Sequence, residues 1–256
     1  MNFIDSHCHL NLLKEDPFEV IDRALKANVT RIIVPGINLE TSKKAIELAE
    51  RFSPVYAAVG IHPNEVENIN PGDLESLKQL VAHRKVIAIG EVGLDYHYLP
   101  FDSQLQKQLL KSMLDLAKIT NKPLILHSRD ALIDLIYLIE NYRKDNQEIT
   151  GVFHMFEGTF KDAEKIVKMG FYYSIGGNIT FKKNQKEKEI IENLGFYNLL
   201  LETDSPFISP HPYRGTQNEP ARIPIIAAKV AEIGQTQVEL IAEITTRNCN
   251  SLFKLD

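Results

Sequence analysis

Two histidines, His7 and His9, lie one residue apart near the start of the chain, in the segment DSHCHL. In an extended segment the side chains of residues i and i+2 point to the same side, so Cys8 between them points to the other side. Neutral imidazoles are good ligands for a divalent metal ion, and Cys8 is then expected to be a small buried apolar residue. An isolated H-x-H triplet is more often structural, so this pair indicates a metal site only together with further ligands.

Four further candidate ligands stand in or directly after apolar segments: Glu91 in VIAIGEVGL, His127 in PLILHS, His154 in GVFHMF and Asp204 in NLLLETDS. Imidazoles and carboxylates form a mixed nitrogen and oxygen ligand set that suits Mg²⁺, Mn²⁺ or Zn²⁺. Six protein ligands are too many for one catalytic ion that must also hold water. We therefore expect two divalent metal ions, with Glu91 as the bridge because its strand lies between the two groups.

The elements that must position these residues alternate along the whole chain. Eight short apolar runs typical of strands are separated by amphipathic segments typical of helices, and the tail from Val238 to Leu252 is a last helix. This alternation predicts parallel strands and an α/β fold, a (β/α)₈ TIM barrel, as one hydrolase domain over residues 1–256. Catalytic residues of such barrels lie at the C-terminal ends of the strands, which is where the candidate ligands stand, so we expect the metal site at that mouth.

Composition limits the classes of function. The chain has 256 residues, a net charge of −5 and two cysteines, Cys8 and Cys249. The charge argues against a broad electrostatic grip on nucleic acid, although it leaves room for a local phosphate site. With so few cysteines, no export signal and no long apolar segment, we expect a cytoplasmic protein with no membrane contact and no obligate protein partner.

Two candidate substrate contacts follow strands. His62 in GIHPN could bind a phosphate or a base, or could be a loop histidine held in a tight turn by Pro63. Arg129 after His127 could hold a phosphate with two hydrogen bonds, or could pair with Asp130 or Asp134. We favour the phosphate role for Arg129.

Two acidic residues and several aromatic residues complete the predicted site. Glu202 lies on the same face as Asp204, where a second carboxyl group is costly to bury, and we expect it to bind substrate, for instance at a terminal hydroxyl. Asp95 is expected to order the loop after Glu91 and to support a metal ligand. Four aromatic residues, Tyr96, Tyr98, Phe156 and Tyr213, could stack on bases or could simply close the barrel.

Seven motifs, in this order and spacing, resemble the TatD family of metal-dependent hydrolases within the amidohydrolase superfamily. They are DSHCHL, VGIHPN, IGEVGLDY, LILHSRDA, GVFH, LLLETDSP and YRG...NEPA, and the resemblance covers essentially the whole chain. The family implies a (β/α)₈ barrel, a divalent metal site and cleavage of phosphodiester bonds, with deoxyribonuclease activity, often exonucleolytic, as the usual assignment.

The resemblance also assigns the ligands. It implies that His7, His9 and Asp204 bind one metal ion, and that His127 and His154 bind the other. It also implies that Glu91 binds both ions, in the place where other members of the superfamily commonly have a carboxylated lysine.

The chain departs from the family pattern in two places. After His154 the family usually has a Cys, Phe, Ser, Gly run, whereas this chain has Met155 and Glu157. Near the end, Gln217 stands where an arginine is common. An added carboxylate and a lost cation both weaken the attraction of an anion, so these positions bear on substrate choice.

The function expected from these residues is hydrolysis of DNA by a hydroxide that two metal ions activate, with Asp204 and Glu91 as the catalytic carboxylates. Because a recessed barrel mouth admits a strand end more easily than a continuous duplex, we expect an exonuclease that acts on a terminus or a single strand. One alternative is an ester or amide hydrolase, such as a deacylase or lactonase, on the same scaffold. An alternative of another class is a catalytically silent binding protein.

Overall fold

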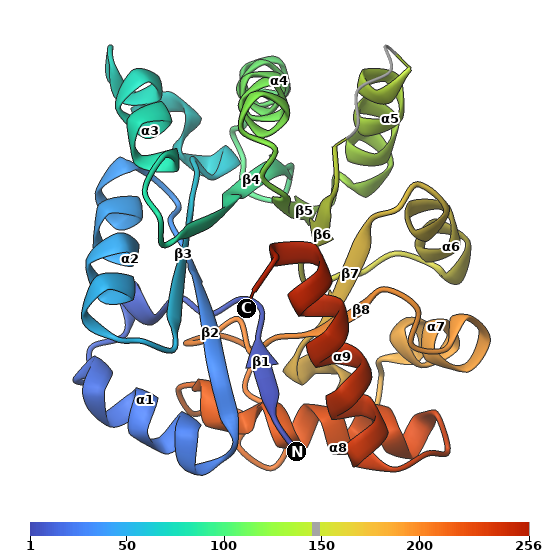
Figure 1. Ribbon diagram of the computed structural model, residues 1–256. Helices are drawn as coiled ribbons and strands as arrows, with labels where there is room; N and C mark the ends of the chain where they lie inside the picture. The colour runs from blue at the N-terminus through green and yellow to red at the C-terminus, as the bar shows by residue number, and fades with distance from the viewer. Residues whose placement is uncertain (145–148, 256) are drawn as a thin grey trace. The chain divides into compact units, whose positions relative to one another are not determined.

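Eight strands, each followed by a helix, make up the computed structural model, which describes residues 1–144 and 149–255 (Figure 1). The strands stand in chain order in one sheet. The first strand pairs in parallel with the second, and the third with the fourth. This arrangement confirms the predicted α/β fold class, the (β/α)₈ barrel. The strands are β1 (Phe3–Asp5), β2 (Val29–Pro35), β3 (Val55–Val59), β4 (Val86–Asp95), β5 (Leu124–Arg129), β6 (Gly151–Phe153), β7 (Tyr172–Ile175) and β8 (Leu199–Leu201).

The helices follow the amphipathic segments that the sequence predicted. The α-helices are α1 (Pro17–Lys26), α2 (Leu39–Arg51), α3 (Asp73–Val81), α4 (Ser103–Thr120), α5 (Leu132–Arg143), α6 (Phe160–Lys168), α7 (Gln185–Leu194), α8 (Ile223–Ile233) and α9 (Val238–Phe253). Short 3₁₀ helices are η1 (Leu10–Leu12), η2 (Pro63–Asn68), η3 (Gly177–Thr180) and η4 (Pro220–Arg222). The last predicted helix is confirmed as α9. Among the described residues, no helix combines the length and the apolar character that crossing a bilayer requires.

Local signals in the sequence explain where the elements begin and end. The α4 helix begins after Asp102, whose carboxylate accepts hydrogen bonds from the backbone N–H groups of Gln104 and Leu105, and it ends at Asn121 in the left-handed conformation. The short strands β1, β6 and β8 are buried at every position. Strands that are buried on both faces read as largely apolar runs, which is why these short segments could be recognised in the sequence.

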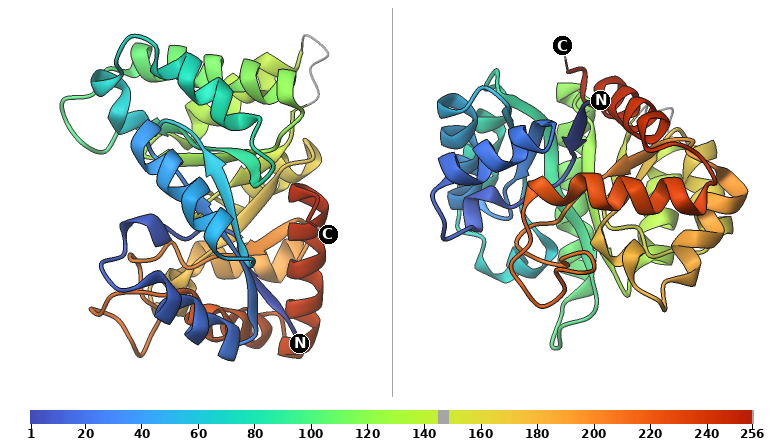
Figure 2. Two further views of the ribbon diagram at one scale, coloured as in Figure 1. Left: turned by 60° about the vertical axis from the view of Figure 1, so that its left-hand side comes forward. Right: turned by 90° about the horizontal axis from the view of Figure 1, so that it is seen from below.

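The chain divides into two compact units. The first unit comprises Met1–Val34 and Met155–Asp256, and the second comprises Pro35–His154. In the first unit β1 pairs with β2, β7 pairs with β8, and α9 packs against β1, β8 and α8 (Figure 2). In the second unit β4 pairs with both β3 and β5, β5 pairs with β6, and α2 and α4 cover β3 and β4. The prediction of one domain over residues 1–256 stays a prediction.

The first strand is shorter than the sequence predicted. It ends at Asp5, so His7 and His9 lie in the segment that follows the strand rather than on it. The physical reason is that the backbone N–H of His7 donates to the carboxylate of Asp5 and so leaves the strand ladder. Beyond the strand, an isolated parallel bridge joins Cys8 to Ser205, which lies in the segment after β8.

Candidate metal centre

In the first unit, His7, His9 and Asp204 form one group of possible metal ligands. The Nε2 atoms of His7 and His9 lie 3.1 Å apart, and they lie 3.7 and 3.6 Å from Oδ1 of Asp204. Both histidines are buried, whereas the side chain of Asp204 is 12% exposed. Three ligand atoms from the ends of β1 and β8 therefore converge on one small volume that water can reach at Asp204.

A buried carboxylate connects the two chain segments that carry this group. Oδ1 of Asp5 accepts hydrogen bonds from the backbone N–H of His7 (3.3 Å) and of Thr203 (3.0 Å), and Oδ2 accepts one from the hydroxyl of Thr203 (2.6 Å). Burial raises the pKa of Asp5 to about 8, against the hydrogen bonds from Thr203 and His7, which lower it. Asp5 thus positions the residues next to Asp204, a role that the sequence analysis missed.

Cys8 lies between the two histidines of this group in the sequence. Its side chain is fully buried, and burial together with the nearby carboxylates of Asp5 and Asp204 raises the pKa of the thiol well above its ordinary value. Metal ions bind the thiolate form of cysteine, which this environment disfavours. The prediction that Cys8 is a buried apolar residue agrees with the structure.

In the second unit, Glu91, His127 and His154 form another group of possible ligands. Oε1 of Glu91 lies 2.8 Å from Nδ1 of His127 and 2.9 Å from Nε2 of His154, and these two nitrogens lie 3.2 Å apart. Glu91 stands within β4, His127 within β5 and His154 directly after β6. Neighbouring parallel strands therefore bring the three side chains together at their C-terminal ends.

Gly93 explains how β4 and β5 approach so closely at this place. It pairs in register with His127, and a Cβ atom at Gly93 would lie only 2.0 Å from the carbonyl oxygen of His127. Its φ angle of +151° is also one that other residues rarely adopt. The GEVG sequence is therefore needed for the position of His127 as well as for the carboxylate of Glu91.

Asp95 holds the far side of the His127 ring. Its Oδ2 lies 3.1 Å from Nε2 of His127 and accepts a hydrogen bond from Asn64, while its Oδ1 accepts one from the backbone N–H of His97. Burial alone would raise the pKa of Asp95, but the hydrogen bonds from His127 and His97 lower it to about 2. Asp95 is thus a carboxylate that fixes Nε2–H of His127 and leaves Nδ1 directed at Glu91.

The same carboxylate interactions act on the imidazole. Burial lowers the pKa of His127, but the hydrogen bonds with Asp95 and Glu91 outweigh it, so the pKa is raised overall. Gln106 of α4 supports the arrangement, because its amide accepts from the backbone N–H of Asp95 (2.9 Å) and donates to the carbonyl of Asp95 (2.8 Å). The sequence analysis missed Gln106. The one sequence feature that could have indicated it is a polar residue at a buried position of α4, where the other buried residues are apolar.

His62 has features of both roles that the sequence left open. Its Nδ1 accepts a hydrogen bond from the backbone N–H of Asn64 at the start of η2, as expected for a loop histidine held in a tight turn. Its Nε2 lies 3.6 Å from Oε1 of Glu91, and its ring contacts that of His127. Burial lowers the pKa of His62 to about 3, so the ring is neutral and carries its proton on Nε2, on the side of Glu91.

The structure places the remaining predicted contacts as follows. Arg129 is half-buried at the end of β5, where its guanidinium lies over the ring of Tyr98 and donates to the Tyr98 hydroxyl (2.9 Å). Asp130 and Asp134, the partners that a purely structural role would use, pair with His97 and Lys107 instead.

Glu202 is fully buried in the first unit. Its Oε1 accepts a hydrogen bond from the backbone N–H of Met155 (2.5 Å), and Met155 also donates to the hydroxyl of Ser174 (3.2 Å). Met155, one of the departures from the family pattern, is thus nearly buried, whereas Glu157 and Gln217 are exposed. Binding of substrate by Glu202 stays a prediction.

The two groups fit divalent metal ions by chemistry and by spacing. Each group contains two imidazole nitrogens and one carboxylate oxygen, the donor types that Zn²⁺ and Mn²⁺ accept. Two nitrogens bound to one zinc ion at about 2.0–2.1 Å in a tetrahedron lie roughly 3.3 Å apart. The nitrogen pairs of 3.1 Å and 3.2 Å are close to this spacing.

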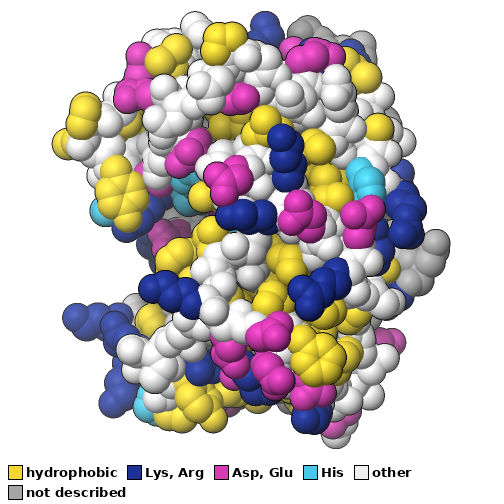
Figure 3. Space-filling view, turned by 90° about the vertical axis from the view of Figure 1, so that its left-hand side faces the viewer, with side chains coloured by type: hydrophobic (Ala, Val, Ile, Leu, Met, Phe, Trp, Pro, Cys, Tyr) yellow, Lys and Arg dark blue, Asp and Glu magenta, His cyan; other side chains and the backbone are white. Residues whose placement is uncertain are grey.

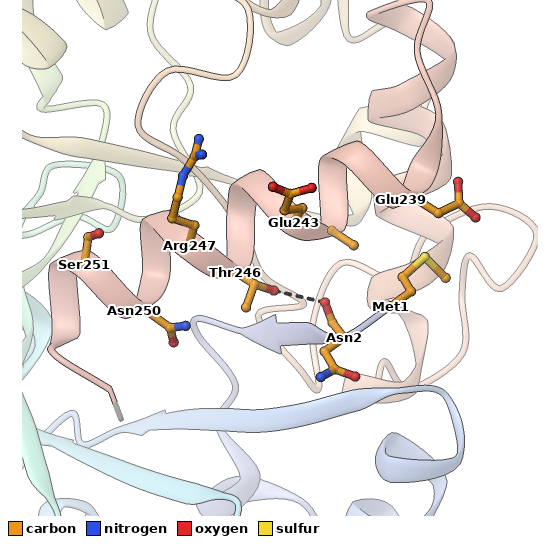
Figure 4. A pocket seen from close by; sticks show the side chains of 9 residues that line it. Met1, Asn2, Glu239, Glu243, Thr246, Arg247, Asn250 and Ser251 are labelled. Atoms are coloured by element: carbon orange, nitrogen blue, oxygen red, sulfur yellow. Dashed lines mark hydrogen bonds between the residues drawn. The ribbon is translucent and has the colours of Figure 1, made fainter.

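A sizeable groove lies at the other end of β1 and is a poor candidate for the site. It has a volume of about 710 Å³ and runs between the first residues of the chain and α9, where the hydroxyl of Thr246 donates to the carbonyl of Asn2 (Figure 4). Its charged lining consists of Glu239, Glu243 and Arg247. Because it adjoins the start of β1, whereas His7 follows the end of that strand, we assign the chemistry to the ligand groups and not to this groove.

Comparisons with known proteins relate the chain to metal-dependent hydrolases. The model of the family described as TatD related DNase matches residues 4–254. The metal-dependent hydrolase YabD of Bacillus subtilis is 40% identical over 254 residues, which cover 98% of this chain and 99% of that protein. The metal-dependent hydrolase YjjV of Escherichia coli is 34% identical over 257 residues, which cover 99% of this chain and 98% of that protein.

Solved structures show the same similarity. The crystal structure of YjjV, a TatD homologue from Escherichia coli, superposes with a TM-score of 0.92 at 33% identity, covering 99% of this chain and 98% of that one. A hydrolase of the TatD family from Entamoeba histolytica superposes with a TM-score of 0.83 at 23% identity, covering 99% and 98%, and shows the same fold.

Proposed function

Because the chain belongs to the TatD-related DNase family of metal-dependent hydrolases, we propose that it cleaves phosphodiester bonds of DNA as an exonuclease that acts on a strand end or on single-stranded DNA. The observation that carries this proposal is the pair of ligand groups, each with two histidines and a carboxylate at the ends of parallel strands. Such groups would suit hydrolysis of an anionic phosphodiester, because divalent ions held there would offset the charge on its oxygens.

The residues that would hold the metal ions are His7, His9 and Asp204 in one group, and His127, His154 and Glu91 in the other. Divalent ions bound there supply a lowered pKa for water and positive charge near the phosphate oxygens. The proposal includes two ions per chain, which are Mg²⁺, Mn²⁺ or Zn²⁺. It also includes Glu91 as a ligand of both ions.

Asp204 is the proposed proton acceptor. Its carboxylate is the member of its group with water access, since the imidazoles of His7 and His9 are buried beside it. Its backbone N–H donates to the carbonyl of His7 (2.9 Å), and its φ of 52° places it in the left-handed region. A fixed carboxylate that reaches water can orient the attacking water, take its proton and later return it to the leaving oxygen.

His62 and Arg129 are the proposed substrate contacts in the second unit. The neutral ring of His62, with Nδ1 occupied by Asn64, offers an Nε2–H donor to a phosphate oxygen or to the leaving group. The guanidinium of Arg129 forms no ion pair within the described residues, so its charge is available to a phosphate. His62 follows β3, which neighbours the strand of Glu91, and Arg129 is the last residue of β5, which carries His127.

The test is a direct nuclease assay. Metal-reconstituted protein is incubated with end-labelled single-stranded DNA, beside metal-free protein and an Asp204→Ala variant. We expect metal-dependent shortening that Asp204→Ala reduces by at least about 100-fold, the size typical of a lost proton-transfer group. Asp22→Ala, which removes an exposed partner of Lys26, is the matched control and should keep full activity.

Two results would contradict the proposal. Wild-type protein that leaves DNA intact but hydrolyses aryl esters would indicate the ester or amide hydrolase. Wild-type protein that is inert on both substrates with its metal bound would indicate a binding protein.

A further inference from the structure

The segment between β8 and η4 carries exposed aromatic side chains directly after Asp204. The side chain of Phe207 is 50% exposed, and its ring meets the ring of His9 edge to face with the centroids 6.2 Å apart. Figure 2 shows this part of the chain as the orange loops that lead to α8. One side of Phe207 therefore contacts a proposed metal ligand, while half of its surface is open to solvent.

Cations from two loops gather beside this segment. The guanidinium of Arg214 lies 4.4 Å from the centroid of the Phe181 ring, and Phe181 is followed by the exposed Lys182 and Lys183. The backbone N–H of His211 donates to the hydroxyl of Thr180 (2.8 Å), which ties the loop after β8 to the loop after β7. These contacts place the two loops beside each other. We name the set Phe181, Lys182, Lys183, Phe207 and Arg214 on these loops the aromatic–cationic surface.

The charges of this surface are not neutralised by the protein. Within the part of the chain that the structure describes, Lys182, Lys183 and Arg214 form no ion pair with a carboxylate. On a chain with a net charge of −5, three unneutralised cations within two adjoining loops are a local reversal of sign. Such a cluster complements a polyanion rather than an apolar or cationic partner.

Phe207 is better placed to stack on a ligand than its aromatic neighbour. Tyr213 is 45% exposed, but the guanidinium of Arg222 lies 4.4 Å from the centroid of its ring and covers one face. Phe207 has no cation over its ring among the described residues. A base that stacks on Phe207 would belong to a nucleotide next to the phosphate at His9 and Asp204.

We propose that the aromatic–cationic surface binds the single-stranded end of a nucleic acid, with a base stacked on Phe207 and phosphates held by Lys182, Lys183 and Arg214. The inference rests on the proposed function, to which it adds the residues that select an unpaired strand. An aromatic side chain can stack on any base that is free of a duplex, and cations beside it can hold the phosphates of the backbone. In a duplex the bases are stacked on one another and are closed to Phe207.

The first test measures binding without hydrolysis. Metal-free protein is titrated into a fluorescein-labelled dT12 oligonucleotide, and binding is followed by fluorescence anisotropy. Phe207→Leu keeps an apolar side chain against His9 but removes the aromatic face. Since base stacking contributes about 1–3 kcal/mol, we expect binding roughly 5- to 150-fold weaker, and Phe207→Tyr should restore it.

The matched control is Tyr197→Leu, which removes an aromatic ring that is even more exposed (74%, against 50% for Phe207) in the same unit just before β8, at the strand end away from Asp204. We expect its affinity for dT12 to equal that of the wild type. Equal affinities of Phe207→Leu and wild type would overturn the role of Phe207.

The second test concerns the cations. The triple variant Lys182→Gln, Lys183→Gln, Arg214→Gln should lower the slope of log Kd against log salt concentration by about 2, because each contact to single-stranded phosphate contributes about 0.7. A control triple variant with the exposed Lys43, Lys44 and Lys78 of α2 and α3 changed to Gln should leave the slope unchanged. A slope that is the same in all three proteins would overturn the phosphate contacts.

A third measurement separates this inference from the proposed function. The metal-loaded protein is assayed on bis(4-nitrophenyl) phosphate, a small diester that has no neighbouring nucleotides. We expect Phe207→Leu to reduce kcat/KM on dT12 at least tenfold more than on the small diester. Equal losses on both substrates would overturn the inference and leave the proposed function standing, whereas an inert wild type on both would contradict the proposed function itself.

Discussion

His127 illustrates how a single residue is prepared for metal binding by its neighbours. Carboxylates face both nitrogens of the ring, Glu91 at Nδ1 and Asp95 at Nε2. The contact with Asp95 keeps a proton on Nε2, so Nδ1 is the nitrogen left to bind a metal ion. The orientation of the ring is thus decided by a residue that is not itself in the ligand group.

We expect Asp95→Asn to weaken metal binding without removing a ligand. An asparagine can still accept from His127, but it lacks the negative charge that makes Nδ1 a stronger base. Loss of such a partner typically lowers metal affinity roughly 10- to 100-fold. Competition with a chromophoric chelator measures the affinity.

Asp130→Asn serves as the control for this prediction, because Asp130 is exposed and pairs with His97 rather than with a proposed ligand. Its metal affinity should match that of the wild type. An affinity of Asp95→Asn within twofold of the wild type would show that Asp95 only orders its own loop.

At the scale of elements, short strands deliver the ligands and the loops after them hold the ligands in place. The C-terminal ends of β4, β5 and β6 bring together Glu91, His127 and His154 because neighbouring parallel strands run in the same direction. In the first unit Asp5 connects the ends of β1 and β8 through Thr203. Each group is therefore supported by hydrogen bonds from outside it.

The start of α7 predicts a pH dependence that is independent of metal. Oε1 of Glu187 accepts hydrogen bonds from the side-chain amides of Asn178 (3.0 Å) and Asn184 (2.9 Å), and burial raises its pKa above the ordinary value of 4.5. The protonated carboxyl of Glu187 makes its full contribution to the free energy of unfolding when the pH is below the ordinary pKa of 4.5. This contribution is lost as pH rises through the raised pKa, because the unfolded chain gives up its proton more readily.

Glu187→Gln should remove this dependence. The glutamine oxygen still accepts hydrogen bonds from both asparagines but has no charge to bury. As pH rises from 4 to 7, the free energy of unfolding of the variant should therefore increase relative to that of the wild type. Urea denaturation of metal-free protein at several pH values measures the difference. Glu189→Gln, at an exposed position of the same helix, is the control, and its free energy of unfolding should change with pH as that of the wild type does. The same pH dependence in Glu187→Gln and the wild type would show that the buried carboxyl has no effect.

At the scale of the whole molecule, charge is mixed rather than concentrated. Figure 3 shows Lys and Arg side chains interspersed with Asp and Glu side chains on one face, in keeping with a net charge of −5. A broad field that draws in DNA is absent from the face in this view. Affinity for an anionic substrate is expected to come from bound metal ions and from local clusters such as the aromatic–cationic surface.

We expect the folded chain to bind two divalent ions. His9→Ala and His154→Ala, which each remove a ligand from one group, should each leave one ion, whereas Glu91→Gln should weaken binding of both. Plasma mass spectrometry after dialysis measures the content. His83→Ala, which removes a partner of Glu50 on the surface, should keep two ions.

Stability should follow the metal content. An ion present at 100 times its Kd raises the free energy of unfolding by about 2.7 kcal/mol, so chelation should lower the Tm of the wild type. A single ion in the wild type, or an unchanged metal content in Glu91→Gln, would contradict the shared role of Glu91.

Much of the fold and of the ligand groups could be predicted from the sequence, because the signals are local. Short buried runs such as LLL before Glu202 are continuous apolar segments, and amphipathic helices such as α4 repeat every three to four residues. In a parallel α/β fold the end of each such run is also a place where chemistry collects. The positions of Glu91, His127 and His154 in their elements followed from this rule alone.

The supporting contacts were decided only by the tertiary structure. Asp5 and Thr203 are 198 positions apart, and Gln106 meets Asp95 across 11 positions, so no periodic pattern joins them. The hydrogen bond from the backbone N–H of His7 to the carboxylate of Asp5 accompanies the end of β1 at Asp5. His7 therefore lies beyond the strand, where the sequence predicted that the strand continues. The sequence by itself determined which residues could bind metal, whereas folding determined which atoms of those residues face one another, because a hydrogen bond depends on distance in space and not on separation along the chain.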